Sequence, residues 1–482
     1  MSKEIRKLKP LSLWNNFANL NAIPRPSKQE QKVVAYLMKF AKLHKLEALI
    51  DPVGNVIMKK PATQGMEDRK AVVLQSHLDM VCQKNNDTDF DFNTQGIKMV
   101  IDGDWVTAVG TTLGADNGLG VAAILSVLES KDIAHPKLEA LFTIDEETGM
   151  TGALGLQAGF LEGEILLNLD TEDDDEIAMG CAGGIDLTAS KTYSLQAVSS
   201  GCGVEIVVKG LRGGHSGMDI HKGFANANKI MNRLLYQIHD LVHISEIDGG
   251  SLRNAIPRES RAVIVCENVK AIEKRLLPLI VDINQEYKTI EPHLQIDIQA
   301  SDRPNNCMPK DQQETMLKTV YAIHNGVYRM SPDMQGLVET SNNLARVLLK
   351  EGEVTILCLT RSATEAGKTD LANQLKSILQ LGLFNVVLSG SYPGWKPNPE
   401  SKILKVLQDI YFDVFKAEPK IIAYHAGLEC GILGKNYPDM DMISFGPTIQ
   451  RAHSPDERAN ISSTQKFWKY LLEILKNIPA KS

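Results

Sequence analysis

Residues 72–81 read Val-Val-Leu-Gln-Ser-His-Leu-Asp-Met-Val, and the rest of the chain is organised around them. The apolar run at the start is typical of a strand buried in a covered sheet. His77 and Asp79 then follow at the carboxyl end of that strand, where open α/β sheets carry their ligand sites. His77 can bind a metal ion, and Asp79 can orient its ring. The alternative to a metal ligand is that His77 is a hydrogen-bonded structural residue, and a single strand end does not decide between the two.

The composition predicts a soluble globular protein of two unequal domains. The chain has 482 residues, of which 43% are hydrophobic and 23% charged, close to the globular average. The net charge of -7 provides no basic stripe for nucleic acid or anionic lipid. We identify neither a membrane span nor a signal-type apolar core, so we expect a cytoplasmic protein.

The seven cysteines do not indicate a disulfide frame or a thiolate zinc site. They are odd in number and scattered along the chain, which does not favour a disulfide frame, and they contain no Cys-x-x-Cys pair of the kind typical of thiolate zinc sites. Cys82 and Cys181 lie close in sequence to candidate catalytic residues, but neighbouring carboxylates are better candidates for the ligands of a metal site.

An alternation of helices and strands predicts an α/β fold for the first part of the chain. Residues 27–30, Ser-Lys-Gln-Glu, fit a capping box that opens a helix. A Gly-rich loop at 110–118 precedes a helix over 119–128, and strands are predicted at 138–144 and 165–169. The loop lacks the spacing of a dinucleotide motif and a Walker lysine, which excludes nucleotide binding.

The character of the sequence changes near residue 188. Residues 204–266 predict a β-α-β unit, and residues 294–380 repeat a similar order, with no element assigned to 336–344. The last ninety or so residues resemble a continuation of the first domain. We therefore predict a first domain formed by residues 1–187 and 392–482, with a mixed central sheet flanked by helices. Residues 188–391 form an inserted α+β domain of two related halves.

Candidate metal ligands lie where strands or the Gly-rich loop end. They are His77, Asp116, Glu147, Asp170 and His453. Histidine nitrogen and carboxylate oxygen suit zinc and related divalent ions, and a carboxylate can bridge two ions about 3.5–4 Å apart. If Asp116 bridges, one ion takes His77 and Asp170 while the other takes Glu147 and His453. This leaves open positions for water and substrate.

Glu146, beside Glu147, is the predicted general base. One carboxylate can bind metal while its neighbour accepts a proton from an activated water and passes it to the leaving amine. The alternative is a solvated charge cluster, which is the interpretation kept for residues 173–176 of the acidic run 170–176. The position after a predicted strand favours the catalytic interpretation.

Five segments together resemble the signature of the co-catalytic zinc metallopeptidases, and within them the bacterial aminoacyl-histidine dipeptidases. They are His-Leu-Asp at 77–79, Gly-Ala-Asp-Asn-Gly at 114–118, Asp-Glu-Glu-Thr-Gly at 145–149, Asn-Leu-Asp at 168–170, and His453. The resemblance covers essentially the whole chain. It implies the five ligands given above, with Glu146 as general base, Asp79 as the orienting acid and the insertion as a lid.

The resemblance also implies a substrate class and partners. An Asp at position 170 goes with dipeptidases and aminopeptidases in this family, so we expect a small dipeptide substrate, including Xaa-His dipeptides such as β-alanyl-histidine. Two divalent ions are expected, zinc first, with cobalt or manganese as alternatives, and so is a homodimer. Candidate substrate-binding residues are His215, Asn254, Arg361 and Glu429.

Two other functions stay open at this point. An N-acyl amino acid amidohydrolase can use the same metal centre, and rates on acylated amino acids against dipeptides separate the two. An inactive metal-binding scaffold is the other alternative. Glu146 and Asp79 argue against a scaffold, because metal storage needs neither a general base nor an orienting acid.

Overall fold

The computed structural model describes residues 3–481 and divides them into two compact units. The first unit comprises residues up to 180, together with 397–423 and those from 429 onward. The second comprises Cys181–Lys396 and Tyr424–Leu428. The units are described separately below. The second unit begins before the predicted residue 188, because strand β9 (Gly183–Thr192) crosses that position.

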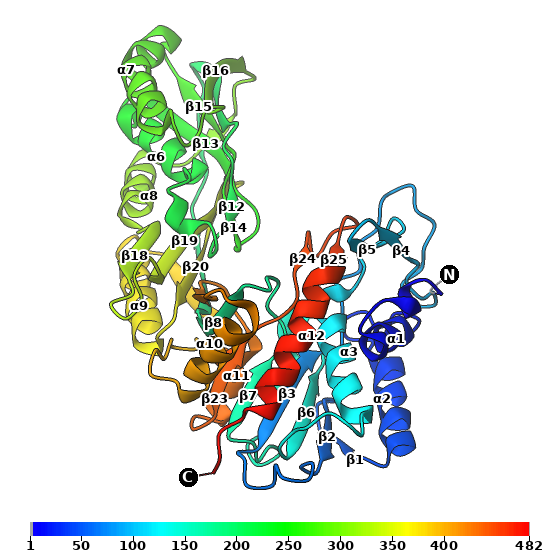
Figure 1. The fold of residues 1–482 in the computed structure, drawn as a ribbon. Helices are drawn as coiled ribbons and strands as arrows, with labels where there is room; N and C mark the ends of the chain where they lie inside the picture. Colours follow the sequence, from blue (N-terminus) through cyan, green and yellow to red (C-terminus); the bar gives the residue numbers. More distant parts are fainter. Residues whose placement is uncertain (1–2, 482) are drawn as a thin grey trace. The chain divides into compact units, whose positions relative to one another are not determined.

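A mixed eight-stranded sheet forms the centre of the first unit (Figure 1), which confirms the predicted fold class. Its strands, in the order in which they lie, are β1 (Glu47–Ile50), β2 (Val56–Lys60), β6 (Leu138–Thr143), β3 (Val72–His77), β7 (Ile165–Asn168), β23 (Asp441–Ser444), β8 (Glu176–Cys181) and β22 (Lys420–Tyr424). The neighbours from β6 to β23 are parallel to one another. Strands β1, β2 and β6 pair antiparallel. Every residue of β3, β6 and β7 is buried, which explains their apolar runs.

Helices flank this sheet. They are α1 (Leu11–Leu20), α2 (Gln31–His44), α3 (Ala115–Glu129), α4 (Glu146–Gly149), α5 (Thr151–Gly155), α10 (Lys402–Phe415), α11 (Glu429–Asn436) and α12 (Ile461–Lys476). Helix α3 packs against β3, α10 against β23, and α12 against α10. A small four-stranded sheet contains β4 (Met99–Asp102), β5 (Trp105–Ala108), β24 (Ile449–Gln450) and β25 (Arg458–Asn460).

The predicted capping box before α2 is wrong. Glu30, not Ser27, is the N-cap residue, and its side chain makes no capping hydrogen bond. Glu30 instead accepts the backbone N–H of Lys28 at 2.8 Å, while the Ser27 hydroxyl donates to Asp79 at 2.7 Å. The hydroxyl of Ser27 is therefore a donor to an ionised carboxylate, a strong charge-assisted hydrogen bond, instead of an acceptor for the N–H groups of the first helical turn.

The second unit has a nine-stranded sheet with four helices along one side (Figure 1). The main path of the sheet runs β16 (Gln295–Ser301), β11 (Cys202–Lys209), β15 (Ser260–Cys266), β13 (Val242–Gly249), β19 (Val338–Lys350), β20 (Glu353–Ser362), β9 and β21 (Asn385–Tyr392), and β18 (Gly326–Met330) pairs with β19. The helices are α6 (Ala227–Ile238), α7 (Val269–Tyr287), α8 (Lys310–Ala322) and α9 (Glu365–Leu381). Two short antiparallel two-stranded sheets pair β10 (Gln196–Ala197) with β17 (Asn306–Cys307), and β12 (Gly214–His215) with β14 (Ala255–Ile256).

The two predicted related halves are confirmed by the order of these elements. One half runs β11-α6-β13-β15-α7-β16, and the other runs β9-α8-β19-β20-α9-β21. Both halves are β-α-β-β-α-β units in which the fourth, first, third and second strands lie in that order in the sheet. The halves join where β13 pairs antiparallel with β19. The first half is inserted into the connection between β9 and α8 of the second.

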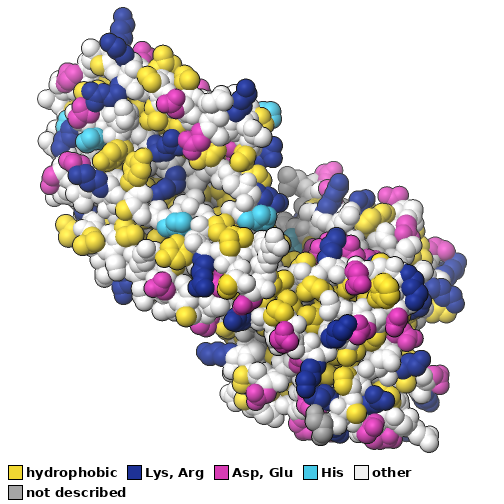
Figure 2. Space-filling view, turned by 60° about the vertical axis from the view of Figure 1, so that its left-hand side comes forward, with side chains coloured by type: hydrophobic (Ala, Val, Ile, Leu, Met, Phe, Trp, Pro, Cys, Tyr) yellow, Lys and Arg dark blue, Asp and Glu magenta, His cyan; other side chains and the backbone are white. Residues whose placement is uncertain are grey.

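Charges of both signs cover the surface. On the face drawn in Figure 2, Lys and Arg side chains are interspersed with Asp and Glu side chains. Within residues 3–481, none of the helices is long and apolar enough to span a bilayer.

Candidate metal centre

Parallel strands bring most of the predicted ligands to one edge of the first unit's sheet. His77 is the last residue of β3, Glu146 and Glu147 begin α4 directly after β6, and Asp170 follows β7. Because β3, β6 and β7 are parallel, their carboxyl ends meet at this edge. Asp116 reaches it from the start of α3, where its backbone angles are not helical.

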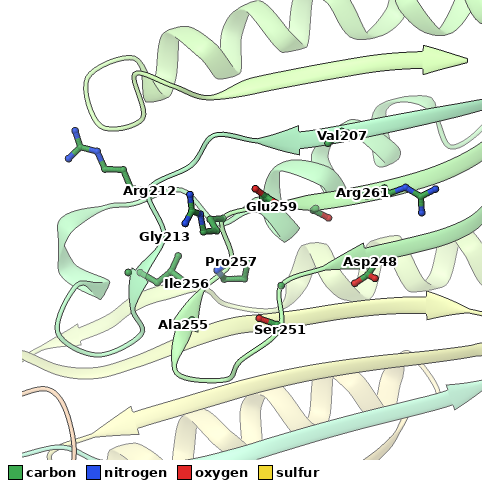
Figure 3. Close-up of a pocket in the computed structure, with 14 residues that line it drawn as sticks. Val207, Arg212, Gly213, Asp248, Ser251, Ala255, Ile256, Pro257, Glu259 and Arg261 are labelled. Carbon is green, nitrogen blue, oxygen red and sulfur yellow. The ribbon is translucent and has the colours of Figure 1, made fainter. Parts of the chain in front are cut away.

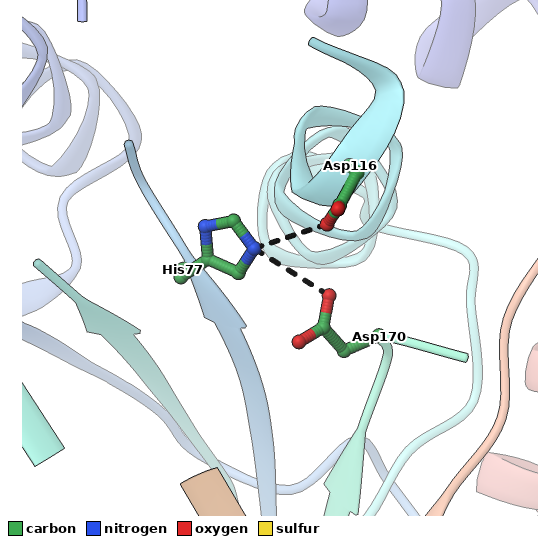
Figure 4. Close-up of side chains that lie close together, drawn as sticks. All are labelled: His77, Asp116 and Asp170. Atoms are coloured by element: carbon green, nitrogen blue, oxygen red, sulfur yellow. Dashed lines mark hydrogen bonds and ion pairs between the residues drawn. The ribbon is translucent and has the colours of Figure 1, made fainter. Parts of the chain in front are cut away.

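His77, Asp116 and Asp170 form one compact group (Figure 4). The Nε2 atom of His77 lies 3.1 Å from Asp116 Oδ1 and 3.6 Å from Asp170 Oδ1. Figure 4 shows both carboxylates pointing at this same ring nitrogen. One nitrogen and two carboxylate oxygens converging on one point are a suitable donor set for a divalent ion.

His453, Asp116 and Glu147 form a second group that shares Asp116 with the first. His453 lies in the loop between β24 and β25, and its Nε2 atom is 3.1 Å from both Asp116 Oδ2 and Glu147 Oε2. The two oxygens of Asp116 thus face two different histidines. This is the arrangement that a bridging carboxylate between two ions needs. His77, Glu146 and Glu147 form a third, overlapping group.

The negative charge of the carboxylates in this cluster is only partly balanced by neighbouring protein side chains. Oε1 of Glu147 is buried and, among the described residues, has no hydrogen-bond partner. Burial raises the pKa of Glu146 well above its ordinary value, and Glu429 and Glu147 act in the same direction. Burial also raises the pKa of Asp170, reinforced by Asp116 and Glu146. Crowded buried carboxylates of this kind fit bound cations.

Asp79 lies behind His77, on the side away from the ligand groups. The His77 Nδ1 atom is 3.4 Å from Asp79 Oδ1 and 3.1 Å from the Asp79 carbonyl oxygen. The Asp79 carboxylate also accepts the backbone N–H groups of Glu146 and Glu147 at 3.0 and 3.2 Å. Although burial opposes it, hydrogen bonds from His77 and Ser27 lower the pKa of Asp79 to about 2. The ionised carboxylate fixes both the ring and the start of α4.

Glu429 lies in a buried polar network of the first unit. Its carboxylate accepts hydrogen bonds from Gln75 Nε2 at 2.6 Å and from Thr143 Oγ1 at 2.7 Å. Burial raises the pKa of Glu429 to about 7. Gln75 in turn accepts a hydrogen bond from Asn168 at 2.5 Å. Sequence reasoning did not single out Gln75 and Thr143, which only stand at the ends of predicted strands, whereas Asn168 belongs to the Asn-Leu-Asp segment at 168–170.

The other predicted substrate-binding residues belong to the second unit. His215 accepts the backbone N–H groups of Gly217 and Met218 on Nδ1, at 3.1 and 3.0 Å, so its proton resides on Nε2. Burial and the Arg361 charge lower the pKa of His215 to about 4. The ring is therefore a neutral hydrogen-bond donor at pH 7.

Arg361 is buried, and its Nη1 donates to the Tyr392 hydroxyl at 2.7 Å. Sequence analysis missed Tyr392, which ends β21 and lies far from Arg361 in the chain. Asn254 is exposed, and its carbonyl oxygen accepts the N–H of Ser216 at 2.8 Å.

A separate hollow of about 830 Å³ lies beside the loop that precedes β12 in the second unit (Figure 3). Its charged lining has both signs: Arg212, Asp248, Arg258, Glu259 and Arg261. Figure 3 shows Arg212 and Arg261 extending in opposite directions. Among the described residues that line the hollow, none is a predicted site residue.

The family is decided by comparison of the whole chain with known proteins. Residues 73–477 match the family described as Peptidase family M20/M25/M40. The chain belongs to this family. The resemblance stated from the five segments is therefore confirmed, and the chain is an enzyme of the M20/M25/M40 peptidases.

Two proteins are similar to this M20/M25/M40 peptidase along its full length. The cytosol non-specific dipeptidase of Escherichia coli (strain K12) is 43% identical over 488 residues, which cover 99% of this chain and 100% of the relative. The crystal structure of aminoacylhistidine dipeptidase from Vibrio alginolyticus is also 43% identical and covers 100% of both chains, with a TM-score of 0.93. A tripeptidase structure from Staphylococcus aureus shares the fold at 16% identity, with a TM-score of 0.58 and 98% and 99% of the two chains covered.

Proposed function

We propose that this chain is a metal-dependent dipeptidase that hydrolyses unblocked dipeptides, including Xaa-His dipeptides such as β-alanyl-histidine. The observation that carries the proposal is the Asp116 carboxylate, whose two oxygens lie 3.1 Å from two different histidines. The names of the two full-length relatives support the substrate class. The cytosolic relative also supports a cytoplasmic location, and the family resemblance supports a homodimer.

His77 and Asp170 are the proposed ligands of one ion, Glu147 and His453 those of the other, and Asp116 bridges them. Nitrogen and oxygen donors of this kind fit zinc, and cobalt or manganese can replace it. Divalent ions bound here supply Lewis acidity, which polarises a carbonyl group and lowers the pKa of a water molecule.

Glu146 is the proposed general base. In that role its carboxylate takes a proton from the attacking water and delivers it to the nitrogen of the leaving amine. Burial raises the pKa of Glu146 above that of an ordinary carboxyl group, the direction expected for a group that must accept a proton as well as release it. Asp79 supports this role, because it accepts the backbone N–H of Glu146 at 3.0 Å.

Four residues are proposed to hold the dipeptide. His215, as a neutral Nε2–H donor, stabilises the oxyanion that develops on the scissile carbonyl. Arg361 binds the terminal carboxylate, for which a guanidinium fork is well shaped. Asn254 contributes a polar contact. Glu429 lies near the free amine, and its buried Oε1 atom has no partner among the described residues.

The variant Glu146→Gln tests the proposal. It keeps the shape of the side chain but removes the proton acceptor, so we expect kcat on a dipeptide to fall about 10²–10⁴-fold while bound metal stays at the wild-type level. Glu162→Gln, at an exposed carboxylate of the same unit, is the matched control and is expected to keep full activity. Dipeptide hydrolysis at the wild-type rate by metal-loaded Glu146→Gln would contradict the assignment.

A further inference from the structure

Glu457 is a buried carboxylate outside the proposed ligand set. It is 2% exposed and follows His453 by four residues in the same loop. Its two oxygens accept the four consecutive backbone N–H groups of residues 113–116, at 2.7, 2.9, 2.7 and 3.3 Å in chain order. A carboxylate that accepts several N–H groups forms a strong, well-defined contact.

This contact joins the two loops that carry His453 and Asp116. His453 has a φ of +62°, a left-handed conformation that a residue with a side chain adopts only with support from its surroundings. Its ring nevertheless lies 3.1 Å from Asp116. Glu457 anchors the His453 loop to the backbone of Asp116 itself, and so sets the separation of these two side chains.

Arg25 extends the same framework toward β3. It is buried, and its guanidinium donates to the carbonyl oxygens of Gly114, Leu78 and Asp79 at 2.6, 3.1 and 3.1 Å. Burial lowers the pKa of Arg25, and Glu457 is the carboxylate that most opposes this. The buried positive charge therefore compensates Glu457 and holds the same loop from the other side.

The Asp116 loop has a second anchor that does not involve Glu457. The Asn117 side-chain amide donates to the Leu169 carbonyl oxygen at 2.8 Å and also to Asp170. His77 is fixed within β3. The group of His77, Asp116 and Asp170 thus keeps anchors of its own besides Glu457, whereas among the described residues His453 reaches the framework through its own loop and Glu457.

We propose that Glu457 is a positioning residue that fixes His453 against Asp116 and selectively sets the affinity of the ion held by Asp116, Glu147 and His453. This inference rests on the proposed two-ion centre. It assigns to Glu457 no contact with metal or substrate.

Zinc binding by Glu457→Gln tests the inference. In this variant an NH₂ group replaces one carboxylate oxygen and faces backbone N–H groups, from which it cannot accept hydrogen bonds. The contact is therefore weakened while the volume of the side chain hardly changes. Chelator-treated full-length protein is titrated with zinc against a competing chelator. We expect two sites in the wild type. In the variant, one site should weaken by about 10–100-fold, as for other residues that orient a ligand, and the other should change little.

Asp456→Asn is the matched control. It removes the same charge one residue away, from a side chain that is 73% exposed and 3.6 Å from Arg451, and both zinc affinities should stay at the wild-type level. Circular dichroism of the metal-free proteins verifies folding, and Glu457→Asp replaces Glu457→Gln if the latter does not fold.

Four outcomes would contradict either the role proposed for Glu457 or the proposed function. Unchanged affinities, or equal weakening of both sites, contradict the role given to Glu457. So does a failure of both Glu457 variants to fold, because Glu457 would then be needed for the fold as a whole. Absence of zinc binding by the wild type instead contradicts the proposed function.

Discussion

At the scale of single residues, the protonation of the two site histidines is the most unusual feature of the metal-free chain. Hydrogen bonds that its ring donates to the Asp116 and Glu147 carboxylates raise the pKa of His453 to about 11. Burial acts to lower the pKa of His77, but Asp170 and Asp116 outweigh it and raise that pKa well above its usual value. These shifts keep a proton on the His453 ring at pH 7 when no metal is bound, and they favour the protonated form of His77.

This protonation predicts how zinc binding depends on pH. A metal ion binds neutral imidazole, so uptake at pH 7 must release protons, and the affinity should rise between about pH 6 and pH 9. Calorimetric titration in two buffers of different ionisation enthalpy measures the release. Proton-free binding with a constant affinity over this range would contradict the assignment of both histidines.

The raised pKa of His453 also predicts how the stability of the metal-free protein changes with pH. Because the folded-state pKa of His453 is raised, its ion pairs stabilise the metal-free protein fully below the unfolded pKa of about 6.5. That contribution is lost as the pH rises through the folded value of about 11. Thermal stabilisation by added zinc should therefore grow toward alkaline pH.

The proposed ligands could be predicted from the sequence, whereas the residues that support them could not. Polar residues that follow an apolar run can be recognised in the sequence itself, and His77 and Asp170 are of this kind. Ser27, Arg25 and Glu457 act through partners 52, 89 and 344 positions away, often backbone atoms of any residue type. Nothing in the sequence marks such contacts.

At the scale of elements, the close approach of α3 to Arg25 explains a glycine inside the helix. A Cβ atom at Gly118 would lie 2.7 Å from Arg25 Nη2 and 2.9 Å from Phe17 Cε2. Gly434 in α11 is the opposite case, since its nearest neighbour would be Met442 Cε at 4.0 Å. Helix α3 therefore has no space for a side chain at position 118, whereas α11 has space for one at position 434.

Alanine at the two positions should therefore have opposite effects. Gly118→Ala is expected to destabilise the protein by about 1–3 kcal/mol through overpacking. Gly434→Ala should stabilise it by about 0.5–1 kcal/mol through helix propensity. Melting temperatures of the metal-free proteins, measured in parallel, give both signs. An increase in both variants would mean that Arg25 is not held as tightly as its hydrogen bonds imply.

Strand β19 shows why one element could not be predicted. The sequence predicts no element over 336–344, where Asn342 and Asn343 interrupt the apolar pattern. Both are nevertheless buried, and their amides donate to the carbonyl oxygens of His324 and Arg253 at 2.7 and 3.0 Å. Partners from distant loops satisfy these polar side chains inside a sheet.

At the scale of the whole molecule, the repeated β-α-β-β-α-β topology explains why the domain organisation was easier to predict than its boundaries. The second pass of strand and helix was visible as a repeated order of elements. The boundary near residue 188 was not, because β9 continues from 183 to 192 without a turn or a change in composition. Residues 424–428, which return to the second unit, also gave no signal.

The central claim is that this M20/M25/M40 peptidase is a metal-dependent dipeptidase. The most direct test is hydrolysis by the purified full-length protein, with and without chelator, of an Xaa-His dipeptide, β-alanyl-histidine, the matching tripeptide and an N-acyl amino acid. We predict cleavage of the dipeptides only, lost on chelation and restored by zinc. Chelator-resistant cleavage, or cleavage of the N-acyl amino acid with none of the dipeptides, would contradict the claim.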